Sequence, residues 1–248
     1  MAATTRLGLS ALPARPYTFV AKAAPSVALP ITDAFTGDNG SIDARLMTDG
    51  GHIWSVDAGT INIASNEVVG GAGGNNVASA SNAPDTADVT VTAKFVTGHA
   101  ANWGGVLGRV TDVNNFYLVT VEPGAGPAYP LELWRRVASN WLQIDVAKSY
   151  TITAGETFGL RCVNDQISLL KGGDIQETVT DANHDTGAMG IWLTGSGTFA
   201  LDDFNVVVAS AAFTPSGQYK WETIYSVRSE QVYSRRSSRE YFRKAITS

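Results

Sequence analysis

The feature that most constrains the fold of this chain is the alternation of apolar and polar residues. In Asp88–Phe95, the side chains of Val89, Val91, Ala93 and Phe95 fall on one face of an extended segment, opposite Thr90, Thr92 and Lys94. A period of two residues is typical of a β-strand that buries one face. Further strands are predicted at 53–56, 60–64, 105–110, 115–121, 131–135, 141–145, 157–163, 166–171, 188–194 and 198–208. Ten or more short strands indicate two packed antiparallel sheets.

Composition agrees with an all-β domain. The 248 residues include 25 glycines and only 17% charged residues, which suits short strands joined by tight turns better than long surface helices. The glycine-rich run at 69–76 is predicted to be a turn or bulge, because it lacks the lysine ending of a phosphate-binding loop. Cys162 is the only cysteine, so an intrachain disulfide and a cysteine-rich zinc site are both excluded.

Charge divides the chain into three regions. Residues 1–30 carry three basic and no acidic side chains, residues 31–212 carry eight basic and twenty acidic ones, and residues 213–248 carry seven basic and three acidic ones. We therefore predict an extended N-terminal arm, one acidic sandwich domain over 31–212, and a basic, aromatic C-terminal arm. No stretch resembles a secretory signal or reaches transmembrane length, so no membrane partner is expected.

The N-terminal arm is interrupted by prolines, which disfavour helix. It also carries Tyr17 and Phe19, apolar groups that a solvated linker does not need. We expect both rings to dock on a neighbouring subunit, and a disordered tail is the alternative.

The C-terminal arm combines strand periodicity with basic and aromatic residues. Two similar tracts, 224–230 and 232–238, suggest a hairpin or two successive strands. The candidate assembly contacts in this arm are Tyr219, Trp221, Tyr225, Arg235, Arg236, Arg239 and Tyr241. They are expected to bind the acidic domain, residues 31–212, of an adjacent copy and so form a homo-oligomer. Contact with nucleic acid and a disordered tail are the alternatives, of which nucleic acid is the less favoured.

Three groups of residues in the middle of the chain carry a resemblance of pattern. The first group contains Asp33-Ala-Phe35, Asp38-Asn-Gly40, Trp54, Gly59, Ile61 and Ile63. The second contains Gly104-Gly-Val-Leu-Gly-Arg109, Asp112 and Asn114-Asn-Phe-Tyr117, and the third Phe158-Gly-Leu-Arg161, Ile167, Leu169, Gly173, Gly187, Gly190 and Leu201-Asp-Asp-Phe204. Together, residues 33–208 resemble the concanavalin A-like lectin/glucanase superfamily in its laminin G-like branch. This resemblance implies a two-sheet antiparallel jelly-roll sandwich, a scaffold that carries lectins, glycosidases, adhesion modules and viral surface domains.

A second, shorter resemblance lies in the N-terminal arm. Leu7-Gly-Leu9 and Pro13-Ala-Arg-Pro-Tyr17 through Lys22 resemble leader arms on small virion proteins of tailed bacteriophages. Together with the two basic arms, this resemblance implies a virion protein that is made in the host cytoplasm.

The sequence offers no clear catalytic pair. Strand-borne glucanases of the superfamily place their acids in a Glu-x-Asp-x-Glu pattern, which is absent here. Asp202 and Asp203 are the closest candidates, but neighbours in a regular strand point to opposite faces. We therefore expect no enzymatic activity.

Metal and cofactor sites are not expected either. The histidines His52, His99 and His184 never fall at metal-ligand spacing. The alternating Asp181, Asn183 and Asp185 could hold calcium, but a solvated Asx-rich turn is the favoured interpretation.

Tryptophan supplies a candidate glycan site. Trp103 with Arg109, and Trp134 beside Arg135 and Arg136, could form a platform on which a sugar ring stacks while polar groups contact its hydroxyls. The alternative is that these tryptophans fill the core of the sandwich.

Two functions follow from these features. The favoured hypothesis is a non-enzymatic virion structural protein, either a capsid decoration or a tail component, that contacts other virion subunits through its arms. The alternative is a carbohydrate-binding module for host-surface glycans, and a glycosidase ranks third.

Overall fold

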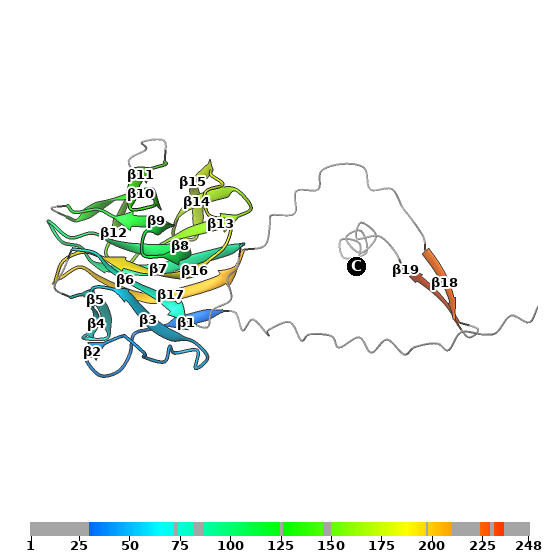
Figure 1. The fold of residues 1–248 in the computed structure, drawn as a ribbon, viewed down its shortest axis with the longest axis horizontal. Coiled ribbons are helices and arrows are strands. Elements are labelled where there is room, and N and C mark those ends of the chain that lie inside the picture. Colours follow the sequence, from blue (N-terminus) through cyan, green and yellow to red (C-terminus); the bar gives the residue numbers. More distant parts are fainter. Residues whose placement is uncertain are drawn as a thin grey trace, which may run out of the picture. The chain divides into compact units, whose positions relative to one another are not determined.

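The computed structural model describes residues 30–71, 74–81, 87–124, 126–145, 150–196, 198–209, 224–228 and 231–235, with side chains described only up to residue 209. The chain divides into two compact units, Met1–Ala209 and Ser210–Ser248. In the described parts of both units the regular elements are strands (Figure 1). None of these residues forms a helix long and apolar enough to cross a membrane.

The first unit contains a nine-stranded antiparallel sheet among its described residues. Along the sheet the strands run in the order β15-β14-β13-β7-β17-β5-β4-β2, and β1 pairs with one end of β17. The bounds are β1 Ile31–Asp33, β2 Gly40–Ser41, β4 Ile61–Ala64, β5 Glu67–Gly70, β7 Val89–Thr97, β13 Thr157–Val163, β14 Gln166–Lys171, β15 Asp174–Thr180 and β17 Ala200–Val208.

The second sheet of this unit has eight antiparallel strands in its described part. Its order is β11-β10-β9-β8-β16-β6-β3, with β12 paired to β10. The bounds are β3 Ile53–Ala58, β6 Asn76–Ser81, β8 Gly104–Asp112, β9 Asn115–Val121, β10 Ala128–Val137, β11 Asn140–Gln143, β12 Tyr150–Thr153 and β16 Ala188–Leu193. The predicted all-β, two-sheet antiparallel jelly-roll sandwich is therefore confirmed. The predicted arms lie almost entirely outside the described residues.

The main core lies between the two sheets. Strand β7 buries the four residues that the alternation placed on one face, and they pack with side chains of the eight-stranded sheet. The core residues of that sheet include Trp54, Tyr117, Val119, Leu131, Leu133 and Ile191. Each buried aliphatic or aromatic side chain contributes about 1.5–3 kcal/mol, so this layer supplies the principal stabilisation.

The predicted strand positions agree with the structure wherever alternation was strong. Strands β9, β13 and β14 have the predicted bounds, and β3, β4, β7, β8, β10, β11, β16 and β17 overlap their predicted segments. Strands β1, β2, β5, β6, β12 and β15 were not predicted. The turn or bulge predicted at 69–76 is too wide, because Val69 and Gly70 end β5 in one sheet and Asn76 begins β6 in the other.

The eight-stranded sheet is apolar on both sides. On the side away from the main core, called here the outer face, a second cluster contains Val77, Leu107, Val110, Phe116, Leu118 and Trp192, with Trp103, Trp134 and Ala188 packed against it. Its members come from the strands of this sheet and the connections next to them. An apolar sheet face that the other sheet does not cover is the natural place to look for a ligand site.

In the second unit, β18 (Ile224–Arg228) and β19 (Gln231–Arg235) pair as an antiparallel hairpin. This agrees with the hairpin alternative that the two similar tracts suggested.

Candidate functional site

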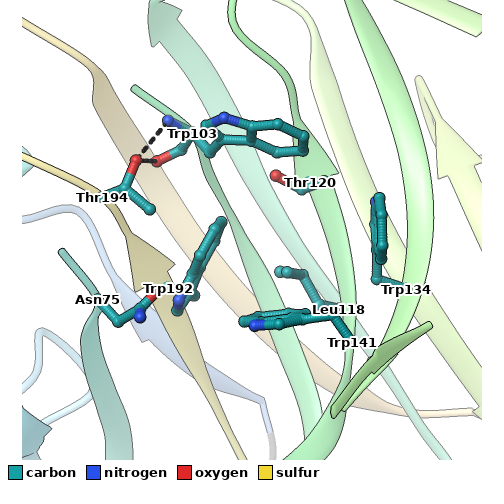
Figure 2. Close-up of a pocket in the computed structure, with 8 residues that line it drawn as sticks. All are labelled: Asn75, Trp103, Leu118, Thr120, Trp134, Trp141, Trp192 and Thr194. Atoms are coloured by element: carbon teal, nitrogen blue, oxygen red, sulfur yellow. Dashed lines mark hydrogen bonds between the residues drawn. The ribbon is translucent and has the colours of Figure 1, made fainter. Parts of the chain in front are cut away.

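Four indole rings surround a hollow of about 270 Å³ on the outer face. Figure 2 shows Trp103, Trp134, Trp141 and Trp192 arranged around this space, with Leu118 and Thr120 between them. We call it the tryptophan hollow; its lining residues are Asn75, Trp103, Leu118, Thr120, Trp134, Trp141, Trp192 and Thr194.

Strand alternation brings these side chains together. Trp192 of β16 lies between Ile191 and Leu193, which both belong to the main core, so its indole must point to the outer face. By the same rule Trp134 of β10 follows the core residue Leu133. Trp141 reaches the hollow from β11, the strand that pairs with β10 on its far side.

Trp103 is held by backbone contacts across the sheet. Its N–H donates to Oγ1 of Thr194 at 2.7 Å, and the N–H of Thr194 donates to its carbonyl at 2.9 Å. These bonds tie the segment before β8 to the end of β16, so the Trp103 ring closes one side of the hollow (Figure 2).

The rings stand at steep angles to one another. Ring centroids of Trp103 and Trp134 lie 6.4 Å apart at 74°, those of Trp134 and Trp141 lie 6.4 Å apart at 85°, and those of Trp141 and Trp192 lie 5.3 Å apart at 57°. Edge-to-face contacts of this kind stabilise aromatic clusters by about 0.5–1.5 kcal/mol per pair beyond area burial. The hollow is therefore preformed.

Contacts with two further side chains fix the orientation of Trp134 and Trp141. Oε2 of Glu132 accepts a hydrogen bond from Nε1 of Trp134 at 2.9 Å, which fixes the orientation of that ring. The guanidinium of Arg136 stacks on the Trp141 ring, 4.8 Å from its centroid, and donates to the carbonyl of Val113 at 2.8 Å.

A carboxyl pair lies beside Trp134. Burial, together with a hydrogen bond to Glu132, raises the pKa of Glu122 to about 8. Burial also raises the pKa of the neighbouring Asp145, whose Oδ2 accepts from the Leu133 N–H at 3.0 Å. At neutral pH Glu122 therefore keeps its proton.

The sequence has no match among protein-family models or curated proteins. Among solved structures, the carbohydrate-binding module CBM66 from Bacillus subtilis is 14% identical, with a TM-score of 0.48 over 63% of this chain and 95% of that one. A Bacillus licheniformis β-glucanase is 9% identical, with a TM-score of 0.42 over 73% and 98%. The CBM2 module of the evolved Dit of Lactobacillus casei BL23 phage J-1 is 12% identical, with a TM-score of 0.41 over 75% and 100%. All three TM-scores are below 0.5, so we draw nothing about the site from them.

Of the three residues predicted as glycan contacts, the structure brings Trp103 and Trp134 together at one hollow. It places the third, Arg109, elsewhere. A bulge in β8 lets Leu107 and Val110 both reach the outer face, and Arg109, which directly precedes Val110, has a φ of 52°. Arg109 is only 1% exposed and donates to the carbonyls of Ala87, His184 and Asn164 at 2.6–2.9 Å. The prediction of Arg109 as a glycan contact, made from its place near Trp103 in the sequence, is therefore corrected, because the bulge turns this side chain away from the outer face.

The aspartates at 202 and 203 also depart from the expected pattern. A register shift between Asp202 and Asn205, with a φ of 47° at Asp203, lets both carboxylates approach Nζ of Lys94, at 3.8 and 3.6 Å. The expectation that they point to opposite faces is therefore wrong. Both lie in β17 of the nine-stranded sheet, and neither lines the tryptophan hollow.

The Asp181 loop is held by protein donors. Although burial opposes it, hydrogen bonds from Tyr117 and Asn183 and the nearby Arg135 charge keep the pKa of Asp181 below its ordinary value. In the described part of the chain no cluster of three or more acidic, histidine or cysteine side chains could hold a metal ion. His52 pairs with Asp49, while Nε2 of His184 lies 2.9 Å from the carbonyl of Arg136, so these rings serve separate parts of the fold.

The predicted assembly contacts lie outside the residues whose side chains are described. Tyr17 and Phe19 precede residue 30, and the C-terminal group follows residue 209. They stay predictions.

Sequence reasoning missed Trp141, Trp192 and the Glu122–Glu132 pair. A usable signal was present for Trp192, because an indole between two aliphatic residues of a predicted strand must face away from the core that those residues form. The carboxyl pair gave no such signal, since its proximity depends on the register between β9 and β10.

Proposed function

We propose that this chain is a non-catalytic carbohydrate-binding protein and that the tryptophan hollow receives a sugar ring. The observation that carries the proposal is four indoles around one open, preformed space on a sheet face that the other sheet does not cover. Apolar ring faces pack against the C–H groups of a pyranose, and a small number of polar groups fix its orientation.

A few polar groups also line the hollow, of which Asn75 is exposed and Thr120 is buried. The lining includes the Asn75 amide and the hydroxyls of Thr120 and Thr194. Trp141 is 37% exposed, whereas Trp192 is 5% exposed, so an entering ring would meet Trp141 first and Trp192 deeper. A mostly apolar hollow with a few polar groups is typical of a site that binds a small molecule.

The Glu122–Glu132 pair supports binding without catalysis. Retaining glycosidases hold their two carboxyl groups about 5–5.5 Å apart and inverting enzymes hold them roughly 6.5–9.5 Å apart, so that each group acts separately. The pKa of Glu122 is raised by burial and by a hydrogen bond to Glu132, so these two groups act on each other rather than separately. Glu132 is also committed to the indole of Trp134.

The test is a glycan array followed by calorimetry on the best ligand with the Trp141→Ala variant. Trp141 is exposed enough to be removed without opening the core, and we expect its loss to weaken binding about ten-fold or more, which is about 1.4 kcal/mol. Leu142→Ala is the matched control, because Leu142 is 50% exposed on the same strand but does not line the hollow. Equal affinity in wild type and Trp141→Ala, or no glycan bound at all, would refute the proposal.

We further propose, as a role for the whole chain, anchoring in a virion through the basic arms. The support is the charge contrast between the arms and the acidic region 31–212. Deleting residues 213–248 should then abolish oligomer formation while the thermal transition of the sandwich is kept. An oligomer of unchanged size on a sizing column would count against this role.

A further inference from the structure

A second hollow lies on the outer face, at the opposite end of β16 from the tryptophans. It has a volume of about 480 Å³, and its lining includes Asp57, Ser79, Thr111, Asp112, Val110 and Ala188. We call it the polar hollow. Its lining differs from that of the tryptophan hollow by two carboxylates, while both hollows contain two hydroxyls.

The two hollows belong to one continuous surface. Ala188 of the polar hollow and Trp192 of the tryptophan hollow lie four residues apart on β16, and both contribute to the apolar cluster of the outer face. At about 3.3 Å per residue, this spacing places them about 13 Å apart along the strand. A ligand longer than one sugar unit that is held by the tryptophans can therefore reach the polar hollow.

The carboxylates of the polar hollow are positioned before any ligand arrives. Asp57 accepts from the hydroxyls of Ser55 at 3.1 Å and Ser79 at 2.6 Å. Asp112 accepts from the N–H of Asn114 at 2.7 Å and from Nδ2 of Asn115 at 2.8 Å, and these bonds hold the pKa of Asp112 below its ordinary value.

Both groups are solvent-exposed and keep further lone pairs for donors. Carboxylate acceptors form the stronger class of hydrogen bond to hydroxyl groups. The described residues that line this hollow include no basic side chain, although the Arg136 charge acts on Asp112 from outside the lining. An anionic ligand would therefore meet two carboxylates and no cation within the described part of the hollow.

We infer that the polar hollow is a second subsite for the same ligand, and that the ligand is an uncharged oligosaccharide whose chain runs along β16 with its hydroxyls donating to Asp57 and Asp112. This inference rests on the proposed function of the tryptophan hollow. It adds three properties of the ligand: the oligosaccharide runs along β16, it contains more than one sugar unit, and it places no uronic or sialic residue in the polar hollow.

The experiment is calorimetric titration with neutral oligosaccharides of one to six units from the cello-, laminari- and fructo-series, alongside sialylated and uronic oligomers. For wild type, affinity should rise with length until the ligand spans both hollows and then level off. Asp57→Asn and Asp112→Asn should each weaken binding of the longest neutral oligomer about ten-fold and leave the shortest binding oligomer unchanged.

The controls separate the two proposals. Asp185→Asn makes the same charge change at an exposed loop residue outside both hollows and should bind like wild type. Trp141→Ala should weaken binding at every length. Three results would refute the second subsite: affinity that does not depend on ligand length, wild-type binding by both aspartate variants, or binding of anionic glycans alone. None of these results refutes glycan binding in the tryptophan hollow.

Cation binding is the remaining outcome to be tested. Thermal melts with added CaCl₂ or EDTA should be the same for wild type, Asp57→Asn and Asp112→Asn. A calcium-dependent rise in Tm that both variants abolish would make the polar hollow a cation site and overturn the inference.

Discussion

At the scale of single residues, the environment of a side chain decides its role more than its type does. Arg109 and Arg136 are both in strands of the eight-stranded sheet. Arg109 is buried and donates to backbone carbonyls, whereas Arg136 lies over an indole ring. Glu122 shows the same dependence, because burial beside Glu132 keeps it protonated at a pH where an exposed glutamate is charged.

Glu122 should make stability depend on pH. Its pKa rises from an ordinary 4.5 to about 8 on folding. Its contribution to the free energy of unfolding is therefore fully present below pH 4.5 and is lost as pH rises through 8. Glu122→Gln replaces the protonated acid by an amide that does not titrate. We expect the Tm of the variant, relative to wild type, to increase between pH 5 and pH 9 in thermal melts.

Asp185→Asn provides the comparison for that series, because it removes one charge from an exposed loop. A Tm difference between Glu122→Gln and wild type that stays constant across this pH range would show that Glu122 does not retain its proton in the folded state.

At the scale of elements, polar contacts as well as the apolar core join the two sheets. Asp33 at the end of β1 is 1% exposed and accepts hydrogen bonds from Nε1 of Trp54 in β3 at 2.7 Å, Oγ1 of Thr48 at 2.9 Å and Nη1 of Arg45 at 2.6 Å. Because β1 belongs to the nine-stranded sheet and β3 to the eight-stranded sheet, this carboxylate ties the sheets together at one end.

Replacing Asp33 should be among the more damaging polar substitutions in the sandwich. Asp33→Ala removes the partner of Arg45 and leaves a buried indole N–H without an acceptor, so we expect a loss of about 3–5 kcal/mol in the free energy of unfolding. Urea denaturation measures this loss. Asp38→Ala, at an exposed turn, should change the free energy of unfolding by less than about 0.5 kcal/mol; equal effects would contradict the role of Asp33.

Strand prediction worked where large apolar residues alternated and failed where they did not. The segment 115–121 was predicted correctly because Tyr117, Val119 and Val121 mark its buried face. Strand β6, with the sequence Asn-Val-Ala-Ser-Ala-Ser, was missed because Ala78 and Ala80 occupy core positions without a strong apolar signal. Nearness in the sequence also does not reveal a bulge, and for that reason Arg109 was wrongly grouped with Trp103.

At the scale of the whole molecule, the sandwich separates stability from recognition. One face of the eight-stranded sheet completes the main core, and its outer face carries both hollows. The sequence indicated part of this surface through Trp103 and Trp134. The remainder depends on the pairing of β10 with β11 and of β16 with β8, which joins residues far apart in the chain.

The most direct test of the central claim, that the tryptophan hollow binds a glycan, is an NMR titration of the indole N–H signals with the tightest ligand from the array. The account predicts that the signals of Trp103, Trp134, Trp141 and Trp192 shift together, while that of Trp54, which is 1% exposed in the main core, stays in place. A saturating glycan that leaves those four signals unmoved would contradict it.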